Sequence, residues 1–352
     1  MKKVTAYILL AIIITIVVVF KLPYLNNKLN MATSYNKSKE YILPNDVRVI
    51  DLIDEENVYI QNKSDNRIYI YNLRNKEIKL FKSEYIGGSK IADIKFSSDW
   101  ILWSEVKGNS WSVFAENKGN KSIKKLYQSD GSQLSSIELY DNYVLYHRNK
   151  NNLLQMVLFD LNKSNELIID EINENTGIFV SIPGISNDKI VWSTNKNVNN
   201  KIVSDIYLYN ILNKEKVLLS NKSNITKPKI YKDIIIATMI ENNQEYTKSS
   251  LVMYDNKINS WNTIISENLD IYKNDKRISI DDPIYDETLL TWWDNKSSDM
   301  YIYDIKNKNI TELDKPEESK INQIYLIKNE YIFFRTVSDL EQKHICKVLK
   351  YN

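Results

Sequence analysis

Apolar and polar residues alternate along most of the chain, and one short aromatic pattern returns seven times. The clearest copies read Ile/Met-Tyr-x-Tyr-Asn/Asp and run into Asn-Lys, at Ile68–Lys76, Ile206–Lys214 and Met300–Lys308. Weaker copies lie at Val157–Lys163 and Leu251–Lys257, and degenerate ones at 113–115 and 345–348. One position per copy (71, 115, 159, 209, 254, 303 and 348) gives intervals of 44, 44, 50, 45, 49 and 45 residues. Such a regular interval predicts a repeated structural unit.

Each unit contains the material for four short strands. In chain order, each unit has an alternating stretch such as Ile91–Phe96, an apolar run such as Ile101-Leu102-Trp103 and then the Tyr motif. A second alternating stretch, such as Glu77–Leu80 in the first unit, follows the motif. Because Asn tolerates positive φ, Asn-Lys predicts the tight turn that Gly would otherwise provide. Four antiparallel strands per unit predict an all-β fold, a β-propeller of four-stranded blades. Seven blades are expected, with six or eight as alternatives, and a solenoid or a β-sandwich as the competing architectures.

The last repeat stops after its third strand, close to Asn352. A fourth strand must then come from elsewhere in the chain, and Tyr41-Ile42-Leu43 has the required apolar character. We expect this segment to close the ring, which would remove an exposed sheet edge.

The repeat resembles the TolB-like and WD40-like propeller families over residues 45–352. The resemblance is carried by the Ile-Tyr-x-Tyr-Asp/Asn strand and by Phe96-Ser97-Ser98-Asp99, which is similar to the Ser-Pro-Asp-Gly turn of TolB-type repeats without its Pro and Gly. Trp293-Asp294 lies in a second strand, so the WD40 dipeptide is not at its usual place. The resemblance implies a propeller that serves as a binding platform, although a fold alone does not imply a function.

The first residues predict a membrane anchor. Lys2 and Lys3 precede the uncharged run Val4–Phe20, which is long enough to span a bilayer near the lower limit. Bulky residues follow Phe20 where a signal peptidase needs small ones, which favours an uncleaved anchor over a cleaved signal peptide. We therefore expect an anchor at 1–22, a flexible tether at 23–40 and the propeller at 41–352. The basic start predicts that the propeller lies on the extracytoplasmic side.

The composition excludes several classes of function and of catalytic site. A net charge of +2 argues against a nucleic-acid-binding protein. The single cysteine, Cys346, excludes an internal disulfide, and the two histidines, His147 and His344, fall in different repeats. Gly-x-Ser-x-Gly and His-Glu-x-x-His motifs do not occur, and the carboxylates around Asp281-Asp282-Pro283, interpreted as a loop, form no glycosidase-type pair. We expect no enzymatic activity, no cofactor and no metal.

The candidate partner-binding residues lie in the sixth repeat and before it. Trp292 and Trp293 are adjacent and should point to opposite faces of one strand. Tyr272 and Asp281 lie in the long interval 266–286, which we expect to project at a rim of the propeller. We expect the same of the segment 195–205. The predicted function is a non-enzymatic, membrane-anchored module that binds an envelope protein. The alternatives are a propeller that binds wall glycan and, third, a hydrolase on this scaffold.

Overall fold

The structure is a computed structural model, and it consists of β-strands joined by turns. It describes residues 39–44, 47–54, 56–129, 131, 136–173, 176–199, 201–242, 247–265, 280–285, 289–294, 299–312, 319–328, 331–338 and 344–350. The predicted anchor at 1–22 lies outside this range. Within it, no helix is long and apolar enough to cross a membrane.

The described strands form seven antiparallel sheets, which we number as blades in chain order. Blades 1 to 3 contain β2 (Val47–Leu52), β3 (Asn57–Asn62), β4 (Ile68–Asn72) and β5 (Ile78–Lys82), then β6 (Lys90–Phe96), β7 (Trp100–Lys107), β8 (Ser110–Asn117) and β9 (Ile123–Ser129), then β10 (Ile137–Tyr140), β11 (Tyr143–Lys150), β12 (Leu153–Asp160) and β13 (Asn165–Asn173). Blade 4 has five strands, because two short ones both pair with β16: β14 (Ile178–Val180), β15 (Gly184–Ser186), β16 (Lys189–Val198), β17 (Lys201–Asn210) and β18 (Lys216–Ser223).

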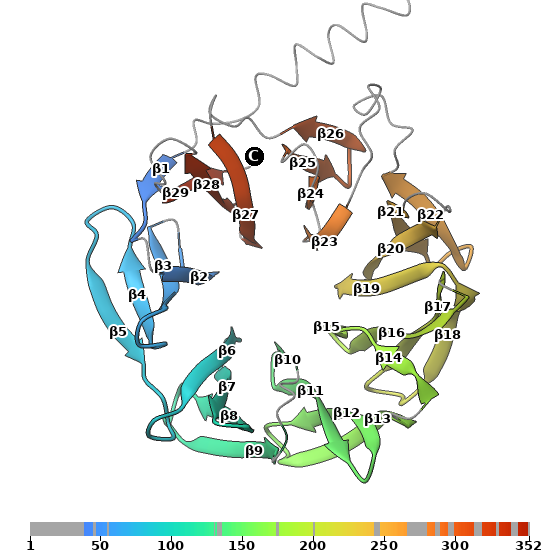
Figure 1. Cartoon of the computed structure of the whole chain (residues 1–352), viewed down its shortest axis with the longest axis horizontal. Coiled ribbons are helices and arrows are strands. Elements are labelled where there is room, and N and C mark those ends of the chain that lie inside the picture. The colour runs from blue at the N-terminus through green and yellow to red at the C-terminus, as the bar shows by residue number, and fades with distance from the viewer. Residues whose placement is uncertain are drawn as a thin grey trace, which may run out of the picture.

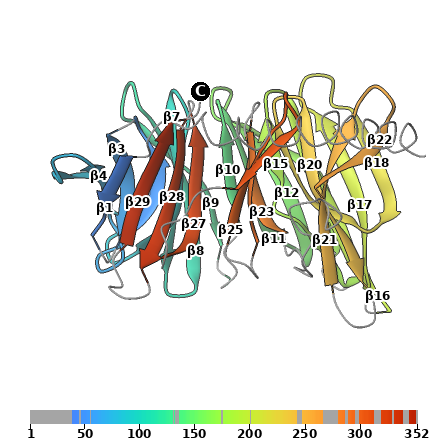
Figure 2. The ribbon, with the colours of Figure 1, turned by 90° about the horizontal axis from the view of Figure 1, so that it is seen from above.

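Blades 5 to 7 complete the ring. They contain β19 (Ile225–Tyr231), β20 (Ile234–Asn242), β21 (Thr247–Asp255) and β22 (Ser260–Ile265), then β23 (Ile280–Tyr285), β24 (Leu289–Asp294), β25 (Asp299–Asp304) and β26 (Asn309–Glu312), then β27 (Ser319–Lys328), β28 (Tyr331–Ser338), β29 (His344–Lys350) and, from the other end of the chain, β1 (Lys39–Ile42). The blades stand around a common axis with β2, β6, β10, β15, β19, β23 and β27 innermost (Figure 1). Seen from the side, the strands cross the thickness of the disc (Figure 2).

The ring is closed by the predicted strand. β1 pairs antiparallel with β29, with Tyr41 opposite Cys346 and Ile42 opposite Ile345. Leu43, which follows β1, is 3% exposed and belongs to the core of blade 1. One boundary is corrected: Lys39 and Glu40, assigned to the tether, belong to this strand, because backbone pairing to β29 does not require apolar side chains.

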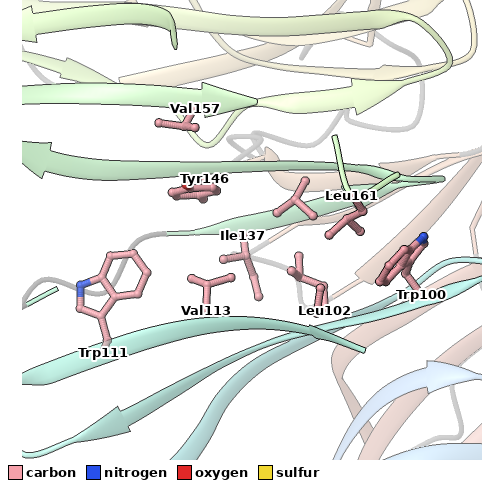
Figure 3. Packing of buried hydrophobic residues seen from close by; sticks show 10 residues of the cluster. Trp100, Leu102, Trp111, Val113, Ile137, Tyr146, Val157 and Leu161 are labelled. Carbon is pink, nitrogen blue, oxygen red and sulfur yellow. The ribbon is translucent and has the colours of Figure 1, made fainter. Parts of the chain in front are cut away.

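The core consists of apolar layers between neighbouring blades. Between blades 2 and 3, Trp100, Trp111 and Val113 meet Ile137 and Tyr146, all at most 4% exposed (Figure 3). The second strand of each well-described blade is covered on both sides, as its unbroken apolar run predicts, and residues 100–105 of β7 are all buried. Burial between blades, rather than within one sheet, therefore holds the ring together.

The Asn-Lys turns place lysine, rather than the expected asparagine, at the position with positive φ. In the turn after β4 the residue with positive φ is Lys76 (φ 64°), and Lys214 (φ 59°) and Lys308 (φ 56°) occupy the same place in their blades. Asn72 caps the turn instead, since its Oδ1 accepts the backbone N–H groups of residues 74 and 75. Asn75, directly before Lys76, also acts through its side chain, because its Oδ1 accepts the backbone N–H of Glu77 at 2.9 Å. Lys76 itself adopts the left-handed conformation at a steric cost.

Replacing Lys76 with glycine is expected to raise the free energy of unfolding by about 0.5 kcal/mol, because glycine adopts positive φ without steric penalty while losing some chain entropy. Urea denaturation followed by circular dichroism measures this change. Lys79→Gly is the matched control, since Lys79 is an exposed residue of the adjacent strand β5, and it should destabilise the protein. A loss of stability in both variants would contradict the role assigned to position 76.

The innermost strand of blade 6 is irregular, and this corrects one expectation. Asp281 and Asp282 lie in β23 rather than in a loop; the register shifts between Asp281 and Ile284, and a proline is tolerated at such a bulge on an edge strand. The segment 195–205 forms the end of the β16–β17 hairpin, whose strands pair as far as Val198 and Lys201 and whose residues 196–199 are exposed. Buried Asn195 in this hairpin accepts hydrogen bonds from Ser204 and from Thr226 of the next blade (2.7 and 2.8 Å).

Candidate functional site

Of the four predicted partner-binding residues, Trp292 is the one whose side chain the structure describes. Trp292 is 1% exposed and stacks on Tyr301 at 5.4 Å, so it is a core residue. Trp293 follows in β24 opposite Asp281 of β23, which brings these two positions together across strands; their side chains are not described. Tyr272 lies outside the described residues.

His147 is buried at the boundary between blades 3 and 4. Burial lowers its pKa to about 4, while the charge of Asp170 opposes this shift. Asp170 also accepts hydrogen bonds from Trp192 Nε1 and Lys216 Nζ, at 2.9 and 3.0 Å. A neutral, 9% exposed imidazole beside these contacts is a packing residue, not a general base at a surface site.

His147 should make the protein sensitive to mild acid. The folded-state pKa lies below the unfolded value, so the unfolded chain binds a proton first, and stability falls as the pH drops from about 6.5 towards 4. At pH 4.5 this loss amounts to about 2 kcal/mol. Unfolding in urea at pH 7.5 and 4.5 should show a smaller pH-dependent loss for His147→Gln than for the wild type. Equal losses would show that His147 does not titrate in this way.

Charged residues of blades 2 and 3 meet on their inner strands, with Arg48 of blade 1 and Lys229 of blade 5 near enough to act on them electrostatically. Lys95 Nζ lies 3.8 Å from Asp93 and 3.7 Å from Glu138 of the next blade, and these three side chains are 27–36% exposed. Burial raises the pKa of Glu138, against the opposing effect of Lys95 and Lys229. Burial would lower the pKa of Lys95, but the two carboxylates outweigh it and raise that pKa. With each charge balanced by a neighbour, this cluster links blades around the axis.

A buried carboxylate holds the connection between blades 1 and 2. Glu105 of β7 is 1% exposed, and its two oxygens accept the backbone N–H groups of Tyr85 and Ile86 at 2.5 and 2.9 Å. Trp103 Nε1 donates to it at 2.7 Å, and the Ser89 hydroxyl lies 2.6 Å away. Lys107 Nζ donates to the carbonyl of Gly87 at 2.7 Å. The loop 83–89 is therefore rigidly positioned although it lies at the surface.

This loop borders a pocket of about 370 Å³ between blades 1 and 2. Tyr85, 58% exposed, stands at one side with its ring 5.1 Å from that of Phe114. Ion pairs surround the rest: Lys82 and Lys121 both pair with Glu116, and Glu84 pairs with Arg67 of the neighbouring hairpin at 3.4 Å. Lys82 also lies over the Trp103 ring, at 3.9 Å from its centroid. The pocket combines an exposed aromatic ring with fixed donors and acceptors.

Exposed apolar side chains are concentrated on blades 3 and 4. Among the described residues, thirteen large apolar side chains are more than about a third exposed, and eight of them belong to these two blades. The eight are Leu167, Ile168, Phe179, Ile182, Val198, Leu212, Val217 and Leu218. Four of them lie on the outer strands of the two blades, Leu167 and Ile168 on β13 and Val217 and Leu218 on β18, and the Lys216–Asp170 ion pair joins these strands at 3.0 Å. We call these four residues the aliphatic face.

Neither the pocket nor the aliphatic face was predicted from the sequence. The sequence does contain a signal for each part of the pocket: Gly87-Gly88, with Gly88 at φ 77°, indicates a loop, and Glu105 stands out as a charged residue at the end of an apolar run. That Glu105 binds this loop is seen only in the folded structure. Within the described part of the chain no three His, Cys, Asp or Glu residues are grouped to hold a metal ion.

No protein-family model matches this sequence, and no curated protein matches it. Solved structures do resemble it. The β-propeller domain of the Trilobed protease from Pyrococcus furiosus, which has an open velcro topology, is 15% identical with a TM-score of 0.62, over 88% of this chain and 95% of that one. An uncharacterised protein from Listeria monocytogenes EGD-e is 12% identical, with a TM-score of 0.58 over 88% and 97% of the two chains.

An oligogalacturonate lyase solved with manganese is 10% identical, with a TM-score of 0.56 over 91% of this chain and 94% of that one. At such identities the similarity establishes the β-propeller fold and nothing about activity. The pairing of β1 with β29 shows that the N-terminal strand closes the ring by completing the last blade.

Proposed function

We propose that this protein is a non-enzymatic interaction module, anchored in the membrane by its N-terminal segment, whose propeller binds an envelope protein on the extracytoplasmic side. The observation that supports a protein partner is the aliphatic face of blades 3 and 4. Protein interfaces bury apolar side chains of this kind, and monomeric proteins rarely cluster them at the surface. No described tryptophan is among the exposed apolar side chains. The aliphatic face therefore lacks the exposed tryptophan rings on which a glycan would stack.

The anchor rests on the uncharged run Val4–Phe20 and the absence of small residues after it. The orientation rests on Lys2 and Lys3. Protease added to intact spheroplasts should digest the propeller, and complete protection would overturn the proposed orientation.

Crosslinking of the tagged full-length chain in cells, with mass spectrometry of the captured material, tests the partner. A double variant, Leu167→Ser with Leu218→Ser, alters the outer strands of blades 3 and 4. The matched control, Ile78→Ser with Leu80→Ser, makes the same kind of change on β5 of blade 1, where both residues are about half exposed. We expect the control to retain a specific protein partner that the first variant loses. Capture of glycan fragments without protein, or retention by both variants, would overturn the proposal.

A further inference from the structure

The pocket beside Tyr85 has features that the aliphatic face does not share. A surface loop is usually mobile, but the loop 83–89 is held by the buried carboxylate of Glu105, which accepts hydrogen bonds from four donors. The result is an aromatic ring that is 58% exposed on a backbone with little freedom. Rigid aromatic side chains bind with little loss of entropy, so a pre-positioned Tyr suits recognition.

The ring and its surroundings fit a sugar. Tyr85 packs against Phe114 at a tilt of 57°, which leaves much of its ring to contact the C–H face of a pyranose. Sugar hydroxyls both donate and accept hydrogen bonds, so they can satisfy the carboxylates and ammonium groups that line the pocket, Glu84, Glu116, Lys82 and Lys121. A volume of about 370 Å³ is at the lower end for ligand pockets and suits one or two sugar rings.

The charge balance indicates an acidic sugar. Glu116 has two ammonium groups within 4 Å, from Lys82 and Lys121, and Glu84 is balanced by Arg67. Two ammonium groups share the single carboxylate of Glu116, so one positive charge is left at this end of the pocket, and the Lys121 side chain is 70% exposed. A carboxylate on the ligand would neutralise that charge at the pocket mouth.

We infer that the pocket between blades 1 and 2 binds a saccharide that carries a carboxylate, stacked on Tyr85 and paired with Lys121. This inference goes beyond the proposed function, since the site lies on other blades than the aliphatic face. Its failure would leave the crosslinking result unaffected, and the reverse also holds.

Calorimetric titration of the purified full-length chain tests the site with two probes, N-acetylmuramic acid and N-acetylglucosamine, which differ by a lactyl group with its carboxylate. We expect the acidic sugar to bind several-fold more tightly, with a preference that shrinks as salt is raised. Tyr85→Ala should weaken binding of both about tenfold. Tyr85→Phe should retain it, which separates loss of the ring from loss of the fold. Tyr231→Ala, an exposed Tyr on β19, should change nothing.

Lys121→Gln should remove the preference for the acidic sugar and leave binding of the neutral one. Its matched control is Lys76→Gln, at the equivalent turn position of blade 1 with the same positive φ. Two results would overturn the inference: no binding of either sugar at tens of millimolar, or affinities that Tyr85→Ala leaves unchanged. If neither sugar binds but a glutamate-rich peptide does, the pocket is assigned to a protein partner.

Discussion

Replacing Glu105 with alanine is expected to lower the free energy of unfolding by about 3 to 5 kcal/mol, among the largest effects of any single substitution here. The carboxylate is 1% exposed and accepts hydrogen bonds from two backbone amides and the Trp103 indole. Alanine would leave these donors without an acceptor in a site closed to water, and each buried unsatisfied donor costs about 1 to 3 kcal/mol. Urea denaturation at neutral pH measures the change.

Two further variants isolate the cause. Glu105→Gln keeps the shape and one acceptor oxygen, but its amide N–H₂ faces a donor, so an intermediate loss is expected. Glu77→Ala, at an exposed position of blade 1, should change stability by less than about 0.5 kcal/mol. Amide hydrogen exchange at residues 85–89 should accelerate in Glu105→Ala and stay unchanged in Glu77→Ala. If Glu105→Ala behaves like Glu77→Ala, the carboxylate does not hold the loop.

Removing the closing strand should have an effect of similar or greater size. A chain that begins at residue 44 lacks the four residues that pair with β29 and loses Tyr41 and Leu43 from the core of blade 1. Loss of a buried Leu alone costs about 2 to 5 kcal/mol, and the freed edge of β29 adds a further loss. We expect a lower urea midpoint and concentration-dependent association on size exclusion.

The proper reference is a chain that begins at residue 39, because it lacks the same N-terminal segment but keeps β1. This shorter deletion should unfold at a clearly higher urea concentration and elute as a single species. Identical midpoints for the two chains would show that closure by β1 contributes nothing to stability, whatever the register shows.

Some expectations depended only on local pattern, and these were confirmed. The Tyr motif and the apolar runs before it predicted the third and second strands of the blades, because alternation and β-branched content act over a few residues. The closing strand could also be predicted, since a repeat that lacks its last strand leaves an edge that only Tyr41-Ile42-Leu43 was placed to cover.

Other features depended on residues far apart in the chain. Asp281-Asp282-Pro283 has the composition of a turn, yet it forms an innermost strand, because the axis-facing edge of a blade needs no N–H donor and accommodates a bulge. Likewise, nothing near Asn195 in the sequence shows that Thr226, from the next blade, will donate to it.

The sequence by itself determined the repeated four-strand unit, the closing strand and the apolar layers between blades, because the same pattern of apolar positions recurs in each repeat. Only the tertiary structure decided which polar residues became sites. Tyr85 and Lys121 are thirty-six residues apart in the numbering, and Glu105 supports one of them from a different strand. Ring closure brings such residues together through blade contacts that no local pattern encodes, so the pocket and the aliphatic face emerge from the packing of neighbouring blades.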